Sequence, residues 1–187
     1  MRILKAVLFL VVVVAAAMPM WAGGDDILGA WLNQKQDANI EIFKCGNDYC
    51  GKIVWLKVPT YPADSKEGTP GKPKIDTKNP DAALKKRPIM GLQIMNGLQY
   101  ADGNLWKSGK IYDPDSGKTY NAKATLVSHD QLDLRGFVGF SLFGRTEKWT
   151  RASEATTSGW RLTARSASPA PSGMTPARPD APAMPGR

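Results

Sequence analysis

The chain has 187 residues, with 25 Lys and Arg against 17 Asp and Glu, which gives a formal net charge of +8. It holds two Cys and one His, too few for a four-ligand zinc site built from these residue types. The positive charges are spread along the chain apart from the cluster Lys85-Lys-Arg87. The sequence therefore contains no long block of like charge.

The N-terminal segment has the pattern of a secretory signal peptide. Arg2 and Lys5 precede an unbroken apolar run over 6–17, and a small residue, Ala22, stands before the polar Gly23-Gly-Asp-Asp26. The run is too short for a good membrane span. We therefore expect residues 1–22 to be a signal peptide cleaved after Ala22, and a periplasmic or secreted mature protein that does not span the membrane.

Loss of this segment lowers the formal net charge to about +6. Because the protein is expected to be exported, we expect no nucleic-acid partner, whereas an anionic membrane surface or another envelope component stays open as a partner. We expect no cofactor and a monomer.

Between residues 27 and 151 short extended runs alternate with turn residues such as Asp102-Gly-Asn104 and Ser128-His-Asp130. The fold class predicted is all-β: an antiparallel, eight-stranded, up-and-down barrel, in which closure removes exposed edges. The strands expected are 27–33, 39–44, 51–58, 89–98, 105–112, 118–127, 131–140 and 145–151. In the sixth, Tyr120, Ala122, Ala124 and Leu126 share the inward face, where two small residues leave space for large neighbours or for a cavity.

One connection, 59–88, is far longer than usual inside a compact domain, which is typical of functional or mobile loops. We expect 59–74 to be mobile and 75–88 to form an ordered lid across one barrel end. Asp76 and Asn79 would start a short helix in the lid, with Pro80 in its first turn.

From Ala152 onward Ser, Thr, Ala, Pro, Gly and Arg dominate, and little apolar surface is available for burial. We expect a single barrel domain over residues 23–151, followed by a disordered tail over 152–187.

Seven sequence blocks along the folded part resemble the exported bacterial domain-of-unknown-function family 2147. They are Cys50-Gly-Lys-Ile-Val-Trp-Leu56, Asp76-Thr-Lys-Asn-Pro80, Arg87-Pro-Ile-Met-Gly-Leu92, Gly109-Lys-Ile-Tyr-Asp-Pro114, Gly117-Lys-Thr-Tyr120, Leu134-Arg-Gly-Phe-Val-Gly139 and Gly144-Arg-Thr-Glu-Lys-Trp-Thr-Arg151. The resemblance implies an exported β-rich domain without an established activity, so no catalytic residue or cofactor is carried over.

A looser resemblance concerns the barrel base. Gly29-x-Trp31 on the first strand and an Arg on the last resemble the lipocalin and calycin barrels, in which a last-strand Arg covers the Trp. The resemblance implies that Arg145 or Arg151 covers Trp31.

Cys45 and Cys50 flank four residues, Gly-Asn-Asp-Tyr, that form a predicted hairpin turn. Because an exported chain meets an oxidising compartment, we favour a disulfide over free thiols or a metal pair.

The last strand carries an unusual face. Arg145, Glu147, Trp149 and Arg151 alternate with Thr and Lys and therefore point the same way. With Trp31 they are predicted to form a structural cluster at the barrel base, in which Arg covers the indole and Glu147 lies between the two guanidinium groups. The functional alternative is a polar floor that receives an anionic group.

Two function classes remain open. The first is a non-enzymatic binding protein that holds a small amphipathic or lipid-like ligand inside the barrel. The second is a structural or envelope-associated protein with a filled barrel that acts through its surface and tail. An enzyme ranks third, because no nucleophile, metal set or carboxylate pair stands out. The ligand-binding residues predicted are Trp55, Arg87, Trp106, Tyr112, Tyr120 and Arg135, although Arg135 alternates with Leu134 and can point outward.

Overall fold

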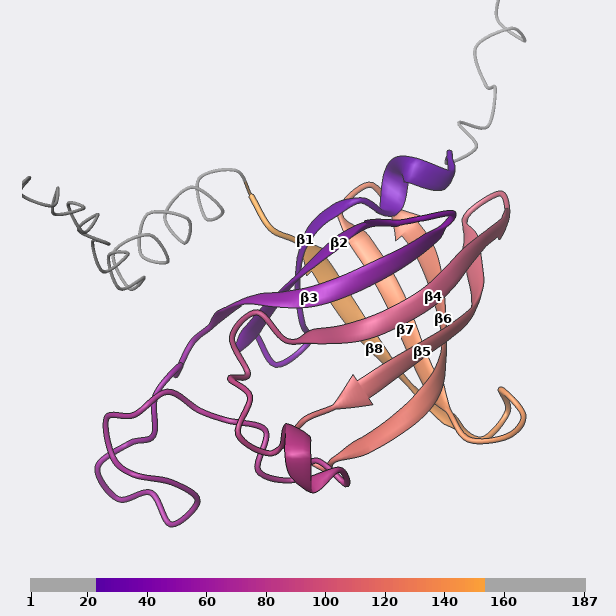
Figure 1. The fold of residues 1–187 in the computed structure, drawn as a ribbon. Helices are drawn as coiled ribbons and strands as arrows, with labels where there is room; N and C mark the ends of the chain where they lie inside the picture. The colour runs from indigo at the N-terminus through magenta and orange to yellow at the C-terminus, as the bar shows by residue number, and fades with distance from the viewer. Residues whose placement is uncertain (1–22, 154–187) are drawn as a thin grey trace, which may run out of the picture.

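A computed structural model of the chain describes residues 23–153. The predicted signal peptide and all but the first two residues of the predicted tail lie outside this range. Within it, eight strands follow one another around a closed antiparallel barrel, and β1 pairs with β8 to close it (Figure 1). The strands are β1 Gly29–Leu32, β2 Ala38–Cys45, β3 Asp48–Leu56, β4 Gln93–Asp102, β5 Leu105–Asp113, β6 Lys118–Ser128, β7 Gln131–Phe137 and β8 Gly144–Arg151. The predicted fold class is confirmed.

Alternation of side chains explains why these runs form a barrel wall. In β6, Ala122, Ala124 and Leu126 are buried while the residues between them are more exposed, as predicted from the sequence. Trp106 pairs with Ala124 across the β5–β6 ladder and is fully buried. The two small residues therefore make room for a large neighbour in this half of the barrel.

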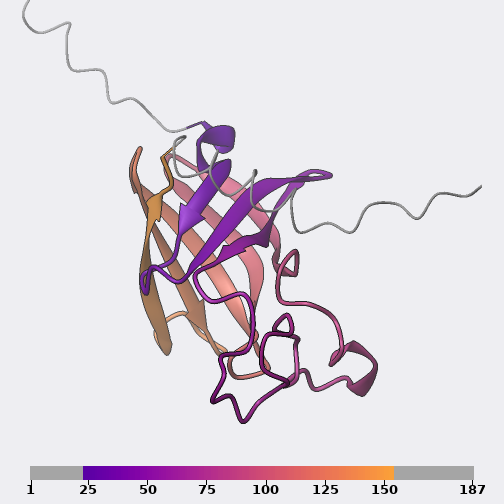
Figure 2. The same cartoon turned by 90° about the vertical axis from the view of Figure 1, so that its left-hand side faces the viewer.

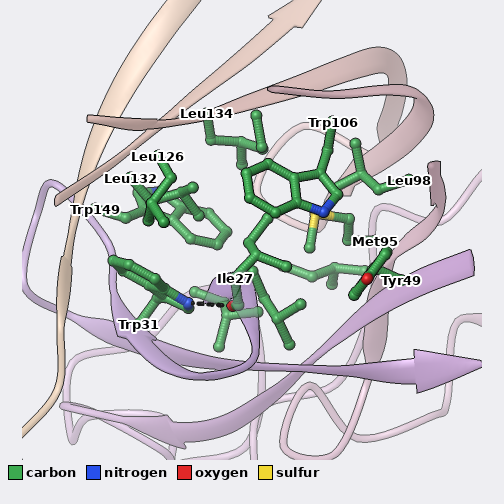
Figure 3. Close-up of a cluster of buried hydrophobic side chains, with 14 of the residues drawn as sticks. Ile27, Trp31, Tyr49, Met95, Leu98, Trp106, Leu126, Leu132, Leu134 and Trp149 are labelled. Carbon is green, nitrogen blue, oxygen red and sulfur yellow. Dashed lines mark hydrogen bonds between the residues drawn. The ribbon is translucent and has the colours of Figure 1, made fainter. Parts of the chain in front are cut away.

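One barrel end is closed by the chain itself. The first residues form a 3-10 helix, η1 Gly24–Ile27, instead of the start of β1, and Ile27 is fully buried. Figure 3 shows Ile27 in the middle of the core, between the indoles of Trp31 and Trp106. Trp31 Nε1 donates a hydrogen bond to the Ile27 carbonyl at 2.9 Å, and Trp106 Nε1 donates to the Gly24 carbonyl at 3.2 Å. Segment 23–28 thus acts as a plug that satisfies the buried indole donors.

The connection from β3 to β4 lies at the other end of the barrel, opposite η1 (Figure 2). Its first part, which we expected to be mobile, folds back on itself through a bridge between Thr60 and Pro73. The Tyr61 amide donates to the Lys72 carbonyl at 2.9 Å, and the Gly71 amide donates to the Tyr61 carbonyl at 2.8 Å. A second bridge, between Ile75 and Pro88, closes the lid segment.

The short helix in this connection is η2 Ala82–Leu84, one turn of 3-10 helix. The prediction that Asp76 and Asn79 start this helix is wrong. Asp81 occupies the cap, with its side chain accepting a hydrogen bond from the Ala83 amide at 2.9 Å. Asp76 is instead buried in the network described below. Within residues 23–153, no helix has the length and apolar character needed to cross a membrane.

Candidate ligand-binding cavity

The end of the barrel opposite η1 contains a cavity of 590 Å³ between the strand ends and the long β3–β4 connection. Aliphatic side chains from five strands form much of its wall. They are Ile40, Ile53, Leu56, Ile94, Ile111 and Leu134. Aromatic rings from β5, β6 and β7 add Tyr112, Tyr120 and Phe137, and the buried Trp149 lies at the inner side next to the core. The cavity can therefore surround an apolar group while one side stays open.

The acidic side chains along this cavity are engaged by neighbours. Asp115 pairs with Lys35 at 3.7 Å, and Glu67 pairs with Lys78 at 3.2 Å. Asp113 accepts a hydrogen bond from Ser116 Oγ at 2.6 Å. The remaining two acids also accept hydrogen bonds, Asp37 from Asn33 Nδ2 and Glu147 from Trp149 Nε1.

Three basic side chains that line the cavity differ from these acids in their hydrogen bonds and ion pairs. The side chains of Lys57, Lys74 and Arg145 line the cavity and make no ion pair or hydrogen bond with any residue of the described range 23–153. An unpartnered guanidinium beside an apolar volume is suited to a carboxylate or phosphate, which it can bind through two parallel hydrogen bonds.

A buried network fastens the lid to the β5 wall. Asp76, which is fully buried, accepts at Oδ1 from Tyr112 Oη at 2.6 Å. Its Oδ2 accepts from Arg87 Nε and Nη2, both at 2.9 Å, and from Asn79 Nδ2 at 2.8 Å. The buried charge is therefore paired and hydrogen-bonded on both oxygens, the condition under which burial of a carboxylate is tolerated.

This environment also changes the acidity of the Tyr112 phenol. Burial, followed by the hydrogen bond to the Asp76 carboxylate, raises the pKa of Tyr112 to about 12. Tyr112 lines the cavity, and its hydroxyl is hydrogen-bonded to Asp76 of the lid. The residue thus belongs to both the wall and the attachment of the lid.

At the closed end, Arg151 covers Trp31. Its guanidinium carbon lies 4.2 Å from the centroid of the indole ring. Arg151 donates to the carbonyls of His129, Leu28 and Asp26 at 2.6, 2.8 and 2.7 Å. Burial lowers the pKa of Arg151, and the nearby carboxylates of Asp130 and Asp26 oppose that shift.

The structure does not hold the predicted base cluster together. Trp31 and Arg151 lie at the closed end, whereas Arg145 and Glu147 line the cavity. Trp149 belongs to the core and also lines the inner side of the cavity. Within residues 23–153, Glu147 forms no ion pair with either Arg and accepts instead from Trp149 Nε1 at 3.4 Å. The reason is strand length: six residues of rise separate Arg145 from Arg151, about 20 Å, so one face of β8 serves both barrel ends.

Two of the six predicted ligand-binding residues, Tyr112 and Tyr120, line the cavity. Trp106 does not. It is fully buried at the closed end, where its ring contacts Tyr49 and Tyr100 with centroid separations of 6.3 and 5.4 Å. Trp106 and Tyr112 lie at opposite ends of β5, and the sequence does not reveal which end is open.

The other three predicted residues also lie outside the cavity lining. Trp55 is half-buried on β3, opposite Asn39 in the β2–β3 register. Arg87 is bound to Asp76, with its guanidinium 5.6 Å from the Tyr112 ring centroid. Arg135 points to the outside, where it donates to the carbonyls of Ser141 and Leu142.

Sequence reasoning missed several lining residues, among them Lys57, Lys74, Phe137 and Phe143. The two lysines belong to the long connection, and its folded-back path is not encoded in any local pattern. Phe137 lies within the strand predicted over 131–140, but the face to which it belongs was not assigned, and β7 ends at Phe137 instead of at residue 140.

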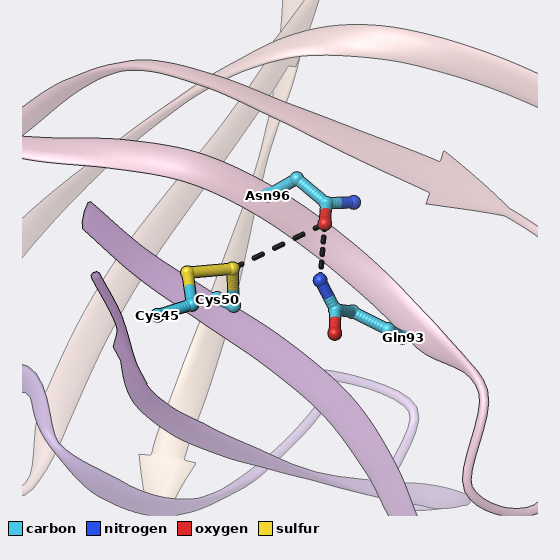
Figure 4. Close-up of a disulfide and its surroundings, with 4 residues drawn as sticks. All are labelled: Cys45, Cys50, Gln93 and Asn96. Carbon is cyan, nitrogen blue, oxygen red and sulfur yellow. Dashed lines mark hydrogen bonds between the residues drawn. A yellow bond between two sulfur atoms is a disulfide. The ribbon is translucent and has the colours of Figure 1, made fainter. Parts of the chain in front are cut away.

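Cys45 and Cys50 form a disulfide, as predicted, with a Cα–Cα separation of 5.9 Å (Figure 4). The bond links the ends of the β2–β3 hairpin, and Cys50 is buried. Asn96 on β4 lies nearby, with Oδ1 4.0 Å from Cys50 Sγ and a hydrogen bond from Gln93 Nε2. Because a disulfide sulfur carries no proton, the sulfur–oxygen approach is a packing contact. Within residues 23–153 no group of three or more His, Cys, Asp and Glu side chains is arranged to hold a metal ion.

A closed eight-stranded antiparallel barrel with one end plugged and a Trp–Arg stack at the closing strands defines a lipocalin-like barrel protein. The chain belongs to the bacterial family described as "Uncharacterized protein conserved in bacteria (DUF2147)", whose model matches residues 29–151. A solved structure with the same fold is that of protein HP1028 from Helicobacter pylori, described as belonging to the lipocalin family. The match has a TM-score of 0.60 and 21% sequence identity, and covers 72% of this chain and 88% of that chain. Among curated proteins, no significant match to this chain is found.

Proposed function

We propose that this protein is an exported binding protein for a small amphipathic, lipid-like molecule with an anionic group. The apolar part of the ligand occupies the cavity, and the anionic group lies at its rim. The observation that carries the proposal is a 590 Å³ volume with aliphatic and aromatic walls beside cations that have no partner within the part of the chain that the structure describes. This volume lies within the range of ordinary small-molecule sites.

The charge expected of the ligand is inferred from the charged side chains that line the cavity. Each acid that lines the cavity is engaged by a cation or a hydrogen-bond donor, whereas the side chains of Lys57, Lys74 and Arg145 have no such partner among residues 23–153. An anionic group would therefore find free donors, and a cationic group would have to displace existing contacts. Arg145 is the residue best suited to orient a carboxylate or phosphate because its planar guanidinium offers two parallel donors.

Export is supported by two independent features. The Cys45–Cys50 disulfide is of the kind that persists in oxidising compartments. The N-terminal residues have the basic start and short apolar run of a signal peptide. From these two features we infer a periplasmic or secreted location.

The proposal is tested with protein purified without delipidation. Native mass spectrometry is expected to reveal a bound small molecule, and a fluorescent fatty acid is expected to bind and to be displaced by unlabelled fatty acid. If neither method detects binding, the proposed function is wrong.

A pair of probes tests the role of the charge. Arg145→Ala is expected to weaken binding of a fatty acid about tenfold, the loss of one hydrogen-bonded charge contact, and to leave binding of the alcohol of equal chain length unchanged. Lys107→Ala is the control, because Lys107 is exposed on β5 outside the cavity lining. An equal loss for both probes would argue against an anionic ligand group.

The alternative from the sequence, a filled structural barrel, is less well supported, since a cavity lies beside the packed core and shares residues such as Ile40 and Leu134 with it. Capture of envelope components with and without residues 152–187 separates the two accounts. Partners that depend on these residues would favour the structural role.

A further inference from the structure

The loop between β7 and β8, residues 138–143, exposes apolar side chains to an unusual degree. Val138, Phe140, Leu142 and Phe143 have exposed fractions of 67, 82, 80 and 72%. Single exposed apolar residues are ordinary on protein surfaces, but a contiguous group of this size is typical of an interaction site.

The loop is held in shape by its own backbone and by Arg135. The Val138 amide donates to the Phe143 carbonyl at 3.3 Å, and the Phe143 amide donates to the Phe140 carbonyl at 3.1 Å. Arg135 donates to the carbonyls of Ser141 and Leu142 at 2.8 and 3.1 Å. The loop's own backbone and Arg135 thus provide hydrogen-bond partners for these polar backbone groups. The apolar side chains at the tip of the loop remain exposed.

The loop lies at the open end of the barrel. Val138 and Phe143 contribute to the cavity lining, so the exposed apolar surface is continuous with the cavity. In Figure 1 the loop projects from the same end of the barrel as the long β3–β4 connection and η2.

Charge is distributed unevenly between the two ends. The connections at the open end, residues 33–37, 57–92, 113–118 and 138–145, contain eleven Lys and Arg against seven Asp and Glu. The segments at the closed end, residues 23–28, 44–48, 102–105, 128–131 and 151–153, contain two Lys and Arg against five Asp and Glu. The open end therefore carries a formal excess of four positive charges, and the closed end an excess of three negative ones.

We infer that the open end docks on an anionic lipid surface, with the tip of loop 138–143 inserted among the lipids. An apolar tip on a barrel end with a formal excess of positive charge matches the chemistry of such a surface, in which hydrophobic insertion and headgroup attraction act together. The negative closed end would be repelled by the same surface, which sets the orientation. The cavity mouth then faces the lipid. This docking goes beyond the proposed binding function and does not require the cavity to be occupied.

Vesicle co-sedimentation tests the docking with the chain from Gly23 to Arg187. The protein is expected to bind vesicles that contain phosphatidylglycerol, to bind pure phosphatidylcholine vesicles more weakly, and to lose affinity as salt concentration rises. Phe140→Ser and Leu142→Ser are each expected to lower the affinity for the anionic vesicles about tenfold, because each removes one inserted apolar side chain. Val127→Ser is the matched control, since Val127 is 52% exposed and lies near the closed end.

A charge-reversal pair tests the orientation. Lys85→Glu with Lys86→Glu, just after η2, is expected to reduce binding to anionic vesicles more than Lys107→Glu with Lys110→Glu on β5, although both pairs change the net charge equally. Unchanged thermal unfolding shows that each variant is folded.

Three outcomes would overturn the inference: no binding to anionic vesicles at low salt, equal loss in the loop variants and the Val127 control, or self-association abolished by Phe140→Ser. The last outcome, measured by analytical ultracentrifugation, would assign the loop to a second copy of the chain. Ligand binding in the cavity is scored separately by fatty-acid displacement, so the two proposals can fail independently.

Discussion

The guanidinium of Arg151 on β8 lies 4.2 Å from the ring centroid of Trp31 on β1, across the seam where the barrel closes. The two residues are also Cα partners in the β1–β8 ladder, and Arg151 reaches from there to three backbone carbonyls around the η1 plug. A single side chain thus connects the last strand, the first strand and the plug.

Arg151→Ala is therefore expected to lower the free energy of unfolding by about 2–3 kcal/mol, through loss of the stack and of hydrogen bonds from a charged donor. Arg151→Lys is expected to recover less than half of this loss, because an ammonium cannot reproduce the planar fork. Arg145→Ala is the matched control on the same strand face and is expected to stay within about 0.5 kcal/mol. Urea denaturation provides the measurement, and equal effects of the two alanine variants would contradict the role of Arg151.

Tyr112 is expected to titrate late. In the unfolded chain its phenol deprotonates near its ordinary pKa of 10.0, whereas in the folded protein the pKa is about 12. Between these values the folded state holds the proton and the unfolded state does not, so the stabilisation is complete below pH 10 and declines as pH rises towards 12. The difference in phenolate absorbance between the unmodified protein and Tyr112→Phe is expected to appear near pH 12. Appearance near pH 10 would show that the hydroxyl is not held by Asp76.

The same substitution is expected to lower the free energy of unfolding at neutral pH by about 1–3 kcal/mol, since it removes one donor from a buried carboxylate. Tyr120→Phe serves as the control, because the Tyr120 hydroxyl makes no hydrogen bond within residues 23–153 and also lines the cavity.

Thiol chemistry checks the disulfide. The unreduced protein is expected to contain no reactive thiol, and two should appear after reduction and unfolding. Cys45→Ser with Cys50→Ser is expected to cost about 2 kcal/mol, since the loop closed is short. Detection of two thiols before reduction would refute the bond.

Gly136 offers a way to fill the cavity without disturbing the barrel. A Cβ at this position would meet Tyr120 Cβ at 3.6 Å and Ile111 Cγ2 at 3.8 Å, which are ordinary contacts. Gly136→Leu is expected to leave the free energy of unfolding unchanged or to raise it. It is also expected to lower the affinity for a fluorescent fatty acid about tenfold, because the added side chain occupies space that the ligand needs.

Gly136→Ala is the graded control for this experiment, with a small effect on binding. Gly109→Ala is the contrasting one, because its Cβ would lie 2.6 Å from Leu98 Cγ and should destabilise the fold. Undiminished binding in Gly136→Leu would mean that the probe does not occupy the cavity.

The sequence by itself determined the features that depend on local patterns. Alternation with a period of two identified the wall strands and the inward face of β6, and the spacing of Cys45 and Cys50 across a turn identified the disulfide. The stack of an Arg on Trp31 was expected from a resemblance, without a choice between Arg145 and Arg151.

Only the tertiary structure decided which end of the barrel is open. Period-two alternation is the same along a whole strand, so it cannot distinguish Trp106, which lies in the packed end, from Tyr112, which lines the cavity at the other end of β5. That distinction depends on where segments distant in sequence fold back: η1 with Ile27 fills one end, and the connection that carries Asp76 lies over the other. Such placement is set by contacts between distant segments, for which no local periodicity exists.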